Sequence, residues 1–206
     1  MTTRIVLALA AVFAMQQAVA QAGAGLHDAN LVPADSLADH ALIDTALADT
    51  IVESRPYLTA MELDRALSGV LSQEDRQALY ASLFRQINLN TASREEIMLI
   101  PGMSERMAHE FEEYRPYASL EQFRREIGKY VDENEVARLE QYVFIPLALN
   151  TASEDELMTI PGMTPKMAHE FEEYRPYASM EQFRREIGKY VDDDEVARLE
   201  SYVTLD

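Results

Sequence analysis

A histidine and several methionines lie close to a Pro-Gly turn, and their residue types first suggest metal chemistry. His109 is followed four positions later by Glu113, so one face of a helix could present both side chains to a metal ion. A zinc-protease helix carries a second histidine at that position, and the copy at His169 departs from it in the same way. The pattern favours an exposed histidine beside acids, with incidental metal binding as the alternative. We therefore predict no metal site and no cofactor.

Methionines flank the same turn, and their thioethers allow three interpretations. Met103 and Met163 occupy its apolar position and are predicted to pack in the core. Met98 and Met107, like their copies sixty residues later, map to outward positions. Exposed, adaptable apolar side chains favour a surface for a protein partner. Packing between repeats and a copper site are the alternatives.

No arrangement for nucleophilic or phosphate-transfer chemistry is present. The chain has no cysteine and four histidines, and it lacks a Gly-x-Ser-x-Gly motif. Gly128-Lys129-Tyr130 lacks the glycine-rich lead and the Ser/Thr of a phosphate loop. We therefore predict a protein without enzyme activity, with no catalytic residues and no disulfides.

The elements that carry these residues are repeated. Residues 89–143 match residues 149–203 at a shift of sixty with eleven mismatches. Arg55-Pro56-Tyr57 lies sixty residues before Arg115-Pro116-Tyr117 and indicates a third, degenerate copy that lacks the Pro-Gly turn. An unrelated helical segment with a chance match is the alternative. We predict three tandem units of about sixty residues, at 31–88, 89–148 and 149–206, with the divergent first unit serving as a cap.

Helix signals divide each unit into two helical hairpins, so the predicted fold class is all-α. Pro101-Gly102 separates a first helix from a second helix at about residues 104–114. Pro116 stops the second helix, because the residue before proline avoids the α conformation. The expected capping residues in this unit are Ser93 with Glu96, Ser119, and Asp132 or Asn134.

The first thirty residues are predicted to lie outside the repeats. Residues 1–22 combine a basic start at Arg4, a short apolar run and small-residue cleavage sites, which is typical of a signal peptide. The apolar run is about half of the ~20 residues that a membrane span needs, so an uncleaved anchor is the weaker alternative. Residues 23–30 are predicted to be a flexible lead-in. The mature protein is expected to be exported, periplasmic or secreted, without a membrane span.

The charge of the chain argues against nucleic acid as a partner. The formal net charge is −18, from 36 acidic and 18 basic residues, and such a field repels DNA and anionic membranes. Arg124, Arg125 and Lys129 are interleaved with Glu121 and Glu126, so we interpret them as a mixed, solvated face.

The residues around the turn resemble a known family. Leu-Asn-Thr-Ala-Ser-x-x-Glu, then Ile-Pro-Gly-Met and Tyr-Arg-Pro-Tyr-x-Ser, is similar to the helix-hairpin-helix domain of the ComEA type, which includes secreted DNA receptors. A structural relative, the PsbU extrinsic subunit of photosystem II, uses a similar double hairpin for protein assembly. The resemblance covers residues 89–143 and 149–203 well and residues 31–88 weakly. It implies a fold of double hairpins, with either DNA or protein as the partner.

In DNA-binding members, backbone N–H groups at the start of the second helix bind a phosphate, and a second glycine leaves room for it. Here Ser104 and Thr164 replace that glycine, and Met107 and Met167 replace a frequently basic position. The residues that the resemblance assigns to a phosphate are Gly102, Ser104, Arg106, Gly162, Thr164 and Lys166.

The second hairpin of each unit departs further from a DNA-binding pattern. Tyr130-Val131-Asp132 stands where Gly-Ile-Gly is expected, and residues 192–195 are all acidic. These carboxylates suit a helix N-terminus but repel phosphate.

We therefore predict an exported, noncatalytic binding or assembly module that docks a protein partner in the cell envelope. The rival hypothesis is a periplasmic or surface DNA-binding protein of the ComEA type. The predicted partner-binding residues are Met98, Met107, Tyr114, Tyr117, Met158, Met167, Tyr174 and Tyr177.

Overall fold

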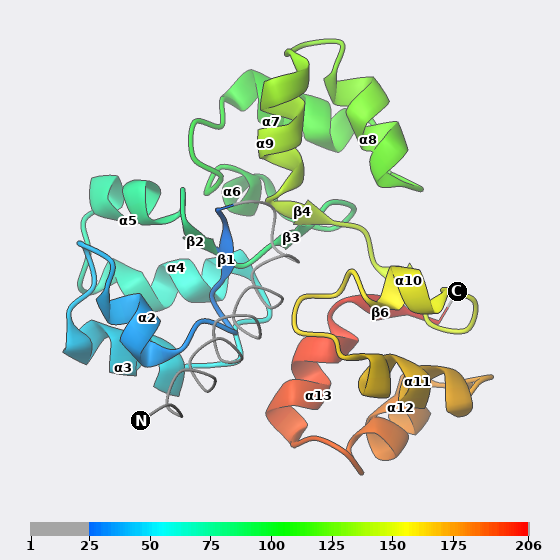
Figure 1. Ribbon diagram of the computed structural model, residues 1–206. Coiled ribbons are helices and arrows are strands. Elements are labelled where there is room, and N and C mark those ends of the chain that lie inside the picture. Colours follow the sequence, from blue (N-terminus) through cyan, green and yellow to red (C-terminus); the bar gives the residue numbers. More distant parts are fainter. Residues whose placement is uncertain (1–24, 206) are drawn as a thin grey trace, which may run out of the picture.

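The computed structural model describes residues 25–205, so the predicted signal peptide at residues 1–22 lies outside the described residues. The chain forms three helical units, seen as three lobes in Figure 1. Each unit opens and closes with two-residue strands that pair in parallel. The pairs are β1 (His27–Asp28) with β2 (Leu83–Phe84), β3 (Ile87–Asn88) with β4 (Val143–Phe144), and β5 (Leu147–Ala148) with β6 (Val203–Thr204).

Each unit contains four short helices, which confirms the helical fold and its tandem repeats. Unit one (residues 27–84) holds α2 (Ala34–Ala38), α3 (Thr45–Glu53), α4 (Ala60–Ser68) and α5 (Gln73–Leu79). Unit two (87–144) holds α6 (Arg94–Ile97), α7 (Glu105–Glu113), α8 (Leu120–Ile127) and α9 (Glu133–Glu140). Unit three (147–204) holds α10 (Glu154–Leu157), α11 (Pro165–Glu173), α12 (Met180–Ile187) and α13 (Asp193–Glu200). The units begin two to four residues before the predicted boundaries, because the closing strand pairs were not predicted.

The predicted capping residues begin the helices of unit two. Ser119 caps α8, and Asp132, not Asn134, caps α9 by accepting from the N–H of Glu135 at 2.9 Å. The predicted capping box at Ser93 forms only in part. Its Glu96 side chain instead accepts from the N–H of Ala60 in unit one at 2.8 Å, so a helix-capping position in unit two also joins two units.

The described part of residues 23–30 is packed into unit one, so its prediction as a flexible lead-in is wrong. Leu26 and Ala29 are buried. The Asn30 side chain is buried as well, donating to the Tyr57 carbonyl at 3.0 Å and accepting from the Tyr57 N–H at 2.7 Å. Asn30 is the unit-one counterpart of Asn90 and Asn150, sixty and one hundred and twenty residues later.

The same pair of hydrogen bonds, between an asparagine side chain and a tyrosine backbone, forms within each of the other two units. Asn90 exchanges hydrogen bonds with the backbone of Tyr117 at 3.0 and 2.6 Å, just after the cis peptide bond at Pro116. Arg115 Nε donates to the Leu89 carbonyl at 2.7 Å. Hydrogen bonds between the Asn-Thr and Arg-Pro-Tyr motifs therefore hold the first loop of a unit against the middle of that unit.

The three units share two hydrophobic cores. Buried residues from Leu26 to Val143 form one continuous cluster across units one and two. Residues from Leu149 to Val203 form a second cluster within unit three. Because apolar burial is the main stabilising term in folding, unit three is a separate packing unit, joined to the rest through contacts outside the two cores.

A buried arginine makes the most extensive of those contacts. Arg85 is fully buried and donates to Tyr202 Oη and Ser201 Oγ of unit three, each at 2.8 Å. It also donates to the Tyr57 carbonyl of unit one at 3.0 Å. Its guanidinium lies 5.2 Å from the ring centroid of Phe144 and 4.4 Å from that of Tyr202. One side chain therefore contacts residues of all three units.

Candidate functional site

The Pro-Gly turns of units two and three have the conformation that the sequence requires. Gly102 and Gly162 have φ values of +75° and +76°, in the left-handed region that glycine tolerates best. The N–H of Met103 donates to the Ile100 carbonyl at 3.0 Å, and Met163 repeats this bond to Ile160. The turn between the first two helices is therefore a rigid, repeated element.

The predicted phosphate-facing positions at the start of α7 and α11 are largely used by the protein itself. Ser104 Oγ and Thr164 Oγ1 accept from the N–H groups of Met107 and Met167, each at 3.2 Å. These hydroxyls cap the helices, as the sequence indicates. The first helical position is Pro165 in unit three, which has no N–H to donate.

In unit two the same position is Glu105, whose carboxylate lies 3.2 Å from Arg94. A carboxylate at this point repels an incoming phosphate. Neither helix start presents the full set of free backbone donors that makes a helix N-terminus an anion site.

The two cations that the resemblance assigns to a phosphate rest against tyrosines. Arg106 Cζ lies 5.8 Å from the ring centroid of Tyr130, and Lys166 Nζ lies 6.0 Å from that of Tyr190. Both side chains are exposed, and neither forms an ion pair within residues 25–205. They are thus available to a ligand, but each stands alone in its unit.

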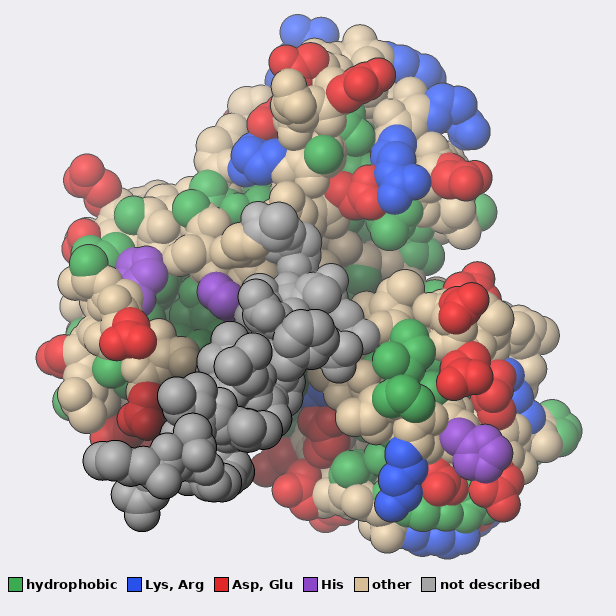
Figure 2. Space-filling view, in the orientation of Figure 1, with side chains coloured by type: hydrophobic (Ala, Val, Ile, Leu, Met, Phe, Trp, Pro, Cys, Tyr) green, Lys and Arg blue, Asp and Glu red, His purple; other side chains and the backbone are tan. Residues whose placement is uncertain are grey.

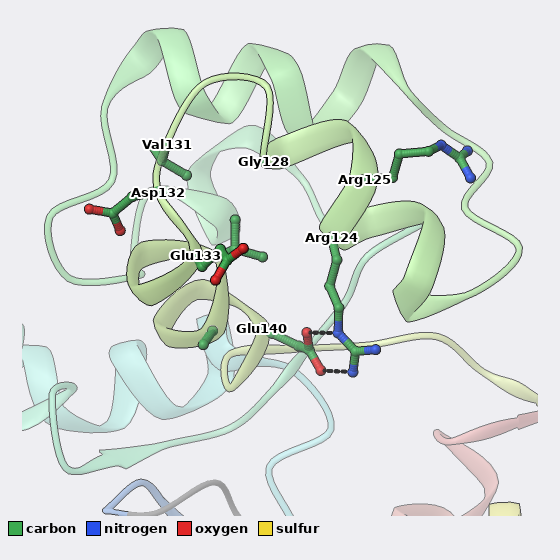
Figure 3. A pocket seen from close by; sticks show the side chains of 9 residues that line it. Arg124, Arg125, Gly128, Val131, Asp132, Glu133 and Glu140 are labelled. Atoms are coloured by element: carbon green, nitrogen blue, oxygen red, sulfur yellow. Dashed lines mark hydrogen bonds and ion pairs between the residues drawn. The ribbon is translucent and has the colours of Figure 1, made fainter.

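The cations on α8 are neutralised by neighbouring acids. Arg124 forms two hydrogen bonds of 2.6 Å with Glu140 across a shallow groove between α8 and α9 (Figure 3), which raise the pKa of the guanidinium. Lys129 and Arg125 both pair with Glu126 and lower the pKa of its carboxyl. Blue and red side chains are correspondingly interspersed over units two and three on the face shown in Figure 2. This arrangement is a mixed surface, not a phosphate-binding patch.

The predicted partner-binding tyrosines divide into two groups. Tyr117 and Tyr177 are buried in the cores, so the prediction that they contact a partner is wrong. Their place is set by the bridging asparagines, which bind the backbone of each tyrosine. Tyr114 and Tyr174 are half-buried.

Tyr114 and Tyr174 each form a pair with a tyrosine of the second hairpin. The Tyr114 and Tyr130 hydroxyls lie 2.8 Å apart, and Tyr174 and Tyr190 repeat this distance. Hydrogen bonding to Tyr114 and to Glu110 raises the pKa of Tyr130. Each pair links the first hairpin of its unit to the second.

The predicted partner-binding methionines are half-buried. Met98 and Met107 pack against the shared core of units one and two, and Met158 and Met167 pack against the core of unit three. Met163 is buried, as predicted for the apolar turn position, whereas its equivalent Met103 is half-buried. Met163 is next to Gly162, which Leu31 of unit one covers, whereas no leucine covers Gly102 beside Met103.

Potential metal ligands do not gather. His109 Nε2 lies 3.3 Å from Glu113 in an exposed pair. Within the described residues, no group of three or more His, Asp or Glu side chains is placed to hold a metal ion. No helix in residues 25–205 is long and apolar enough to cross a membrane.

Both Pro-Gly turns contact unit one, a feature that the sequence did not predict. Gln77 Nε2 of unit one donates to the Leu99 carbonyl, just before the turn of unit two, at 3.2 Å. The Leu31 side chain of unit one lies directly over Gly162, where a Cβ would come within 3.1 Å of both of its methyl groups. Each turn is therefore a contact point for another part of the protein.

Comparison with known proteins agrees with this geometry. The helix-hairpin-helix motif matches residues 83–142 and again residues 145–203. The chain belongs to the helix-hairpin-helix family. The matched ranges cover most of units two and three, and of unit one they include only the closing strand at residues 83–84.

Two curated relatives carry the same description, endonuclease/exonuclease/phosphatase family domain-containing protein 1. The Xenopus laevis protein is 28% identical over 169 residues, which cover 68% of this chain and 28% of the relative. The Bos taurus protein is 27% identical over 143 residues, which cover 48% of this chain and 25% of the relative. The chain thus spans about a quarter of the length of these relatives. No solved structure matches it.

Proposed function

We propose that this chain is an exported, noncatalytic assembly module that docks a protein partner in the cell envelope through its helix-hairpin-helix units. The observation that carries this proposal is the use of both Pro-Gly turns as protein contacts. Gln77 bonds at the turn of unit two and Leu31 covers that of unit three. In unit three, Leu31 occupies the surface that a phosphate-binding hairpin must keep open to its ligand.

The surroundings of the turns support a protein partner over DNA. Pro165 removes one backbone donor, and Glu105 adds a negative charge at the matching position of unit two. Asp132 and Asp192 occupy the corresponding cap of each second hairpin. A DNA site of the ComEA type would need several unpaired cations. Among residues 25–205, units two and three each offer one exposed cation without an ion pair, Arg106 and Lys166.

A DNA-binding assay separates this proposal from its rival. We expect no saturable binding of a 20-base-pair duplex at about 20 mM salt and protein concentrations up to about 100 µM, where phosphate contacts are strongest. Fluorescence anisotropy of the labelled duplex measures this directly. Submicromolar binding that salt weakens, and that the Arg106→Ala plus Lys166→Ala variant reduces, would establish the rival instead.

The protein partner itself is accessible by affinity capture from the native envelope. We expect a stoichiometric partner that survives physiological salt, because contacts at the turns are apolar and hydrogen-bonded. Recovery of nucleic acid alone would contradict the proposal.

A further inference from the structure

Unit one supplies a segment that sits on the turn of unit three like a bound ligand. Tyr202 Oη donates to the Asp28 carboxylate at 3.2 Å. Three residues further along, Leu31 lies over Gly162. The contacted surface consists of the Pro-Gly turn, Arg198 and Tyr202, which together form a notch between α13 and the turn before α11.

The notch shows signs of being filled. Arg198 is folded beneath the segment, with only 3% of its side chain exposed. Its Nη1 donates to the Pro161 carbonyl at 2.7 Å. Pro161 and Met163 are buried. A Cβ on residue 162 would make a tight contact of 3.1 Å with both Leu31 methyl groups, so the glycine lets the leucine approach closely.

Unit two carries the same residues, and there the Pro-Gly turn and the arginine are uncovered, while Tyr142 is buried against Phe84 of unit one. Ile100-Pro101-Gly102-Met103, Glu135, Arg138 and Tyr142 repeat their counterparts in unit three without change. Arg138 forms the same ion pair with Glu135 at 2.7 Å, yet 34% of its side chain is exposed. Pro101 and Met103 are half-buried. The nearest atom to a Cβ on Gly102 is the Arg138 guanidinium at 3.8 Å, and no leucine lies over it.

The difference follows from the connectivity of the chain and not from the chemistry of the notch. At this position of the repeat, unit one carries the segment Asp28–Leu31, which contacts unit three. The equivalent segments of units two and three carry Thr91 and Thr151 in place of Leu31. The chain therefore has two notches and one leucine-bearing segment within residues 25–205.

We propose that the notch of unit two, formed by Pro101, Gly102, Met103 and Arg138, is an open docking site for an extended partner segment with an acidic residue three positions before a leucine. The Asp28–Leu31 segment on unit three is its occupied copy. In this site the leucine covers Gly102, and the acidic side chain lies near Arg138. This inference rests on the proposed protein-docking function and names the surface and the chemistry of the partner.

A peptide of residues 26–34, Leu-His-Asp-Ala-Asn-Leu-Val-Pro-Ala, is the probe for this site. We expect it to shift the Met103 methyl signal of the ¹³C-methionine-labelled protein saturably, with one peptide bound per chain. The Met163 signal should not move, because its notch is already filled. A weak affinity, with Kd of roughly 0.1–1 mM, is expected of so short a peptide that must be ordered on binding.

Two variants give the test its specificity. The peptide with Leu31→Asp should lose about fivefold or more in affinity, because Leu31 is 40% exposed in its contact with unit three and contributes only part of the free energy of a fully buried leucine. Arg138→Ala in the protein should weaken binding by a similar factor. Arg124→Ala, which changes a half-exposed arginine on the other side of α9, is the matched control and should bind the peptide normally.

Three outcomes would overturn the inference. The first is no shift of Met103 up to several millimolar peptide. The second is a shift of Met163 in place of Met103, which would mean that the peptide only displaces the segment of unit one. The third is concentration-dependent dimerisation through Met103 without peptide, which would assign the notch to a second copy. None of these outcomes would be evidence for DNA binding. The proposed function is therefore tested separately, by the DNA-binding assay.

Discussion

Replacing Phe171 with alanine is expected to unfold unit three while units one and two remain folded. Phe171 is fully buried and packs edge-to-face on Phe183 with ring centroids 5.0 Å apart. Truncating a buried phenylalanine costs about 3–5 kcal/mol. The core of unit three contains only fourteen buried residues, and a domain this small has a stability of the same order.

Hydrogen exchange read by mass spectrometry measures this effect unit by unit. Amides in residues 149–203 should lose their protection, and those in residues 45–143 should keep it. The matched control is Phe111→Ala, at the equivalent position of unit two, where the Phe111 and Phe123 rings are 5.2 Å apart. Because units one and two share a core, this variant should expose both of them together. Loss of protection over the whole chain in Phe171→Ala would show that the three units fold as one.

The helices and their caps could be predicted because their signals are local. Ser104 and Ser119 cap the helices that they precede, and Gly102 takes the left-handed conformation that a tight turn requires. Each of these features depends on residues within four positions of each other. The repeat of sixty residues then transferred the prediction from one unit to the next.

Contacts between distant residues could not be predicted in the same way. The paired strands are two residues long and have no measurable alternation. Arg85 and Tyr202 are 117 positions apart. One signal was nevertheless present, since Arg85 stands where the other units have Ile145 and Leu205. A charge at an apolar position of a repeat indicates a contact that the other units do not make.

The error at Tyr117 has a related cause. An aromatic residue in a loop after proline resembles a surface anchor for a partner. The same Arg-Pro-Tyr motif occurs in unit one, which lacks the Pro-Gly turn altogether. A motif that persists where the turn is lost serves the fold and not the turn, and the hydrogen bonds between Asn90 and Tyr117 show how.

Replacing Arg85 with alanine is expected to release unit three from units one and two. The substitution removes four hydrogen bonds of 2.7–3.0 Å and both ring contacts. A hydrogen bond from a charged donor contributes about 1.5–3 kcal/mol, more than a typical surface ion pair.

Small-angle X-ray scattering and hydrogen exchange can check this release together. We expect the Arg85→Ala protein to have a larger radius of gyration, with loss of protection at residues 201–204, while the cores of all three units stay protected. Arg125→Ala, at an arginine whose side chain is 67% exposed, is the control and should leave both measurements unchanged.

The Arg85→Leu variant separates two effects of the arginine at this interface: the stability of the contact between the units and the orientation of unit three. Leucine occupies the equivalent position 205, and an apolar replacement of a buried charge often restores stability. We expect Arg85→Leu to recover much of the stability but not the hydrogen bonds to Ser201 and Tyr202. The orientation of unit three relative to units one and two should therefore be less well defined. If Arg85→Ala keeps the radius of the unaltered protein, apolar surface and the Leu31 contact suffice to close the interface. The notch of unit three would then stay filled without the arginine, and the two notches would differ through Leu31 alone.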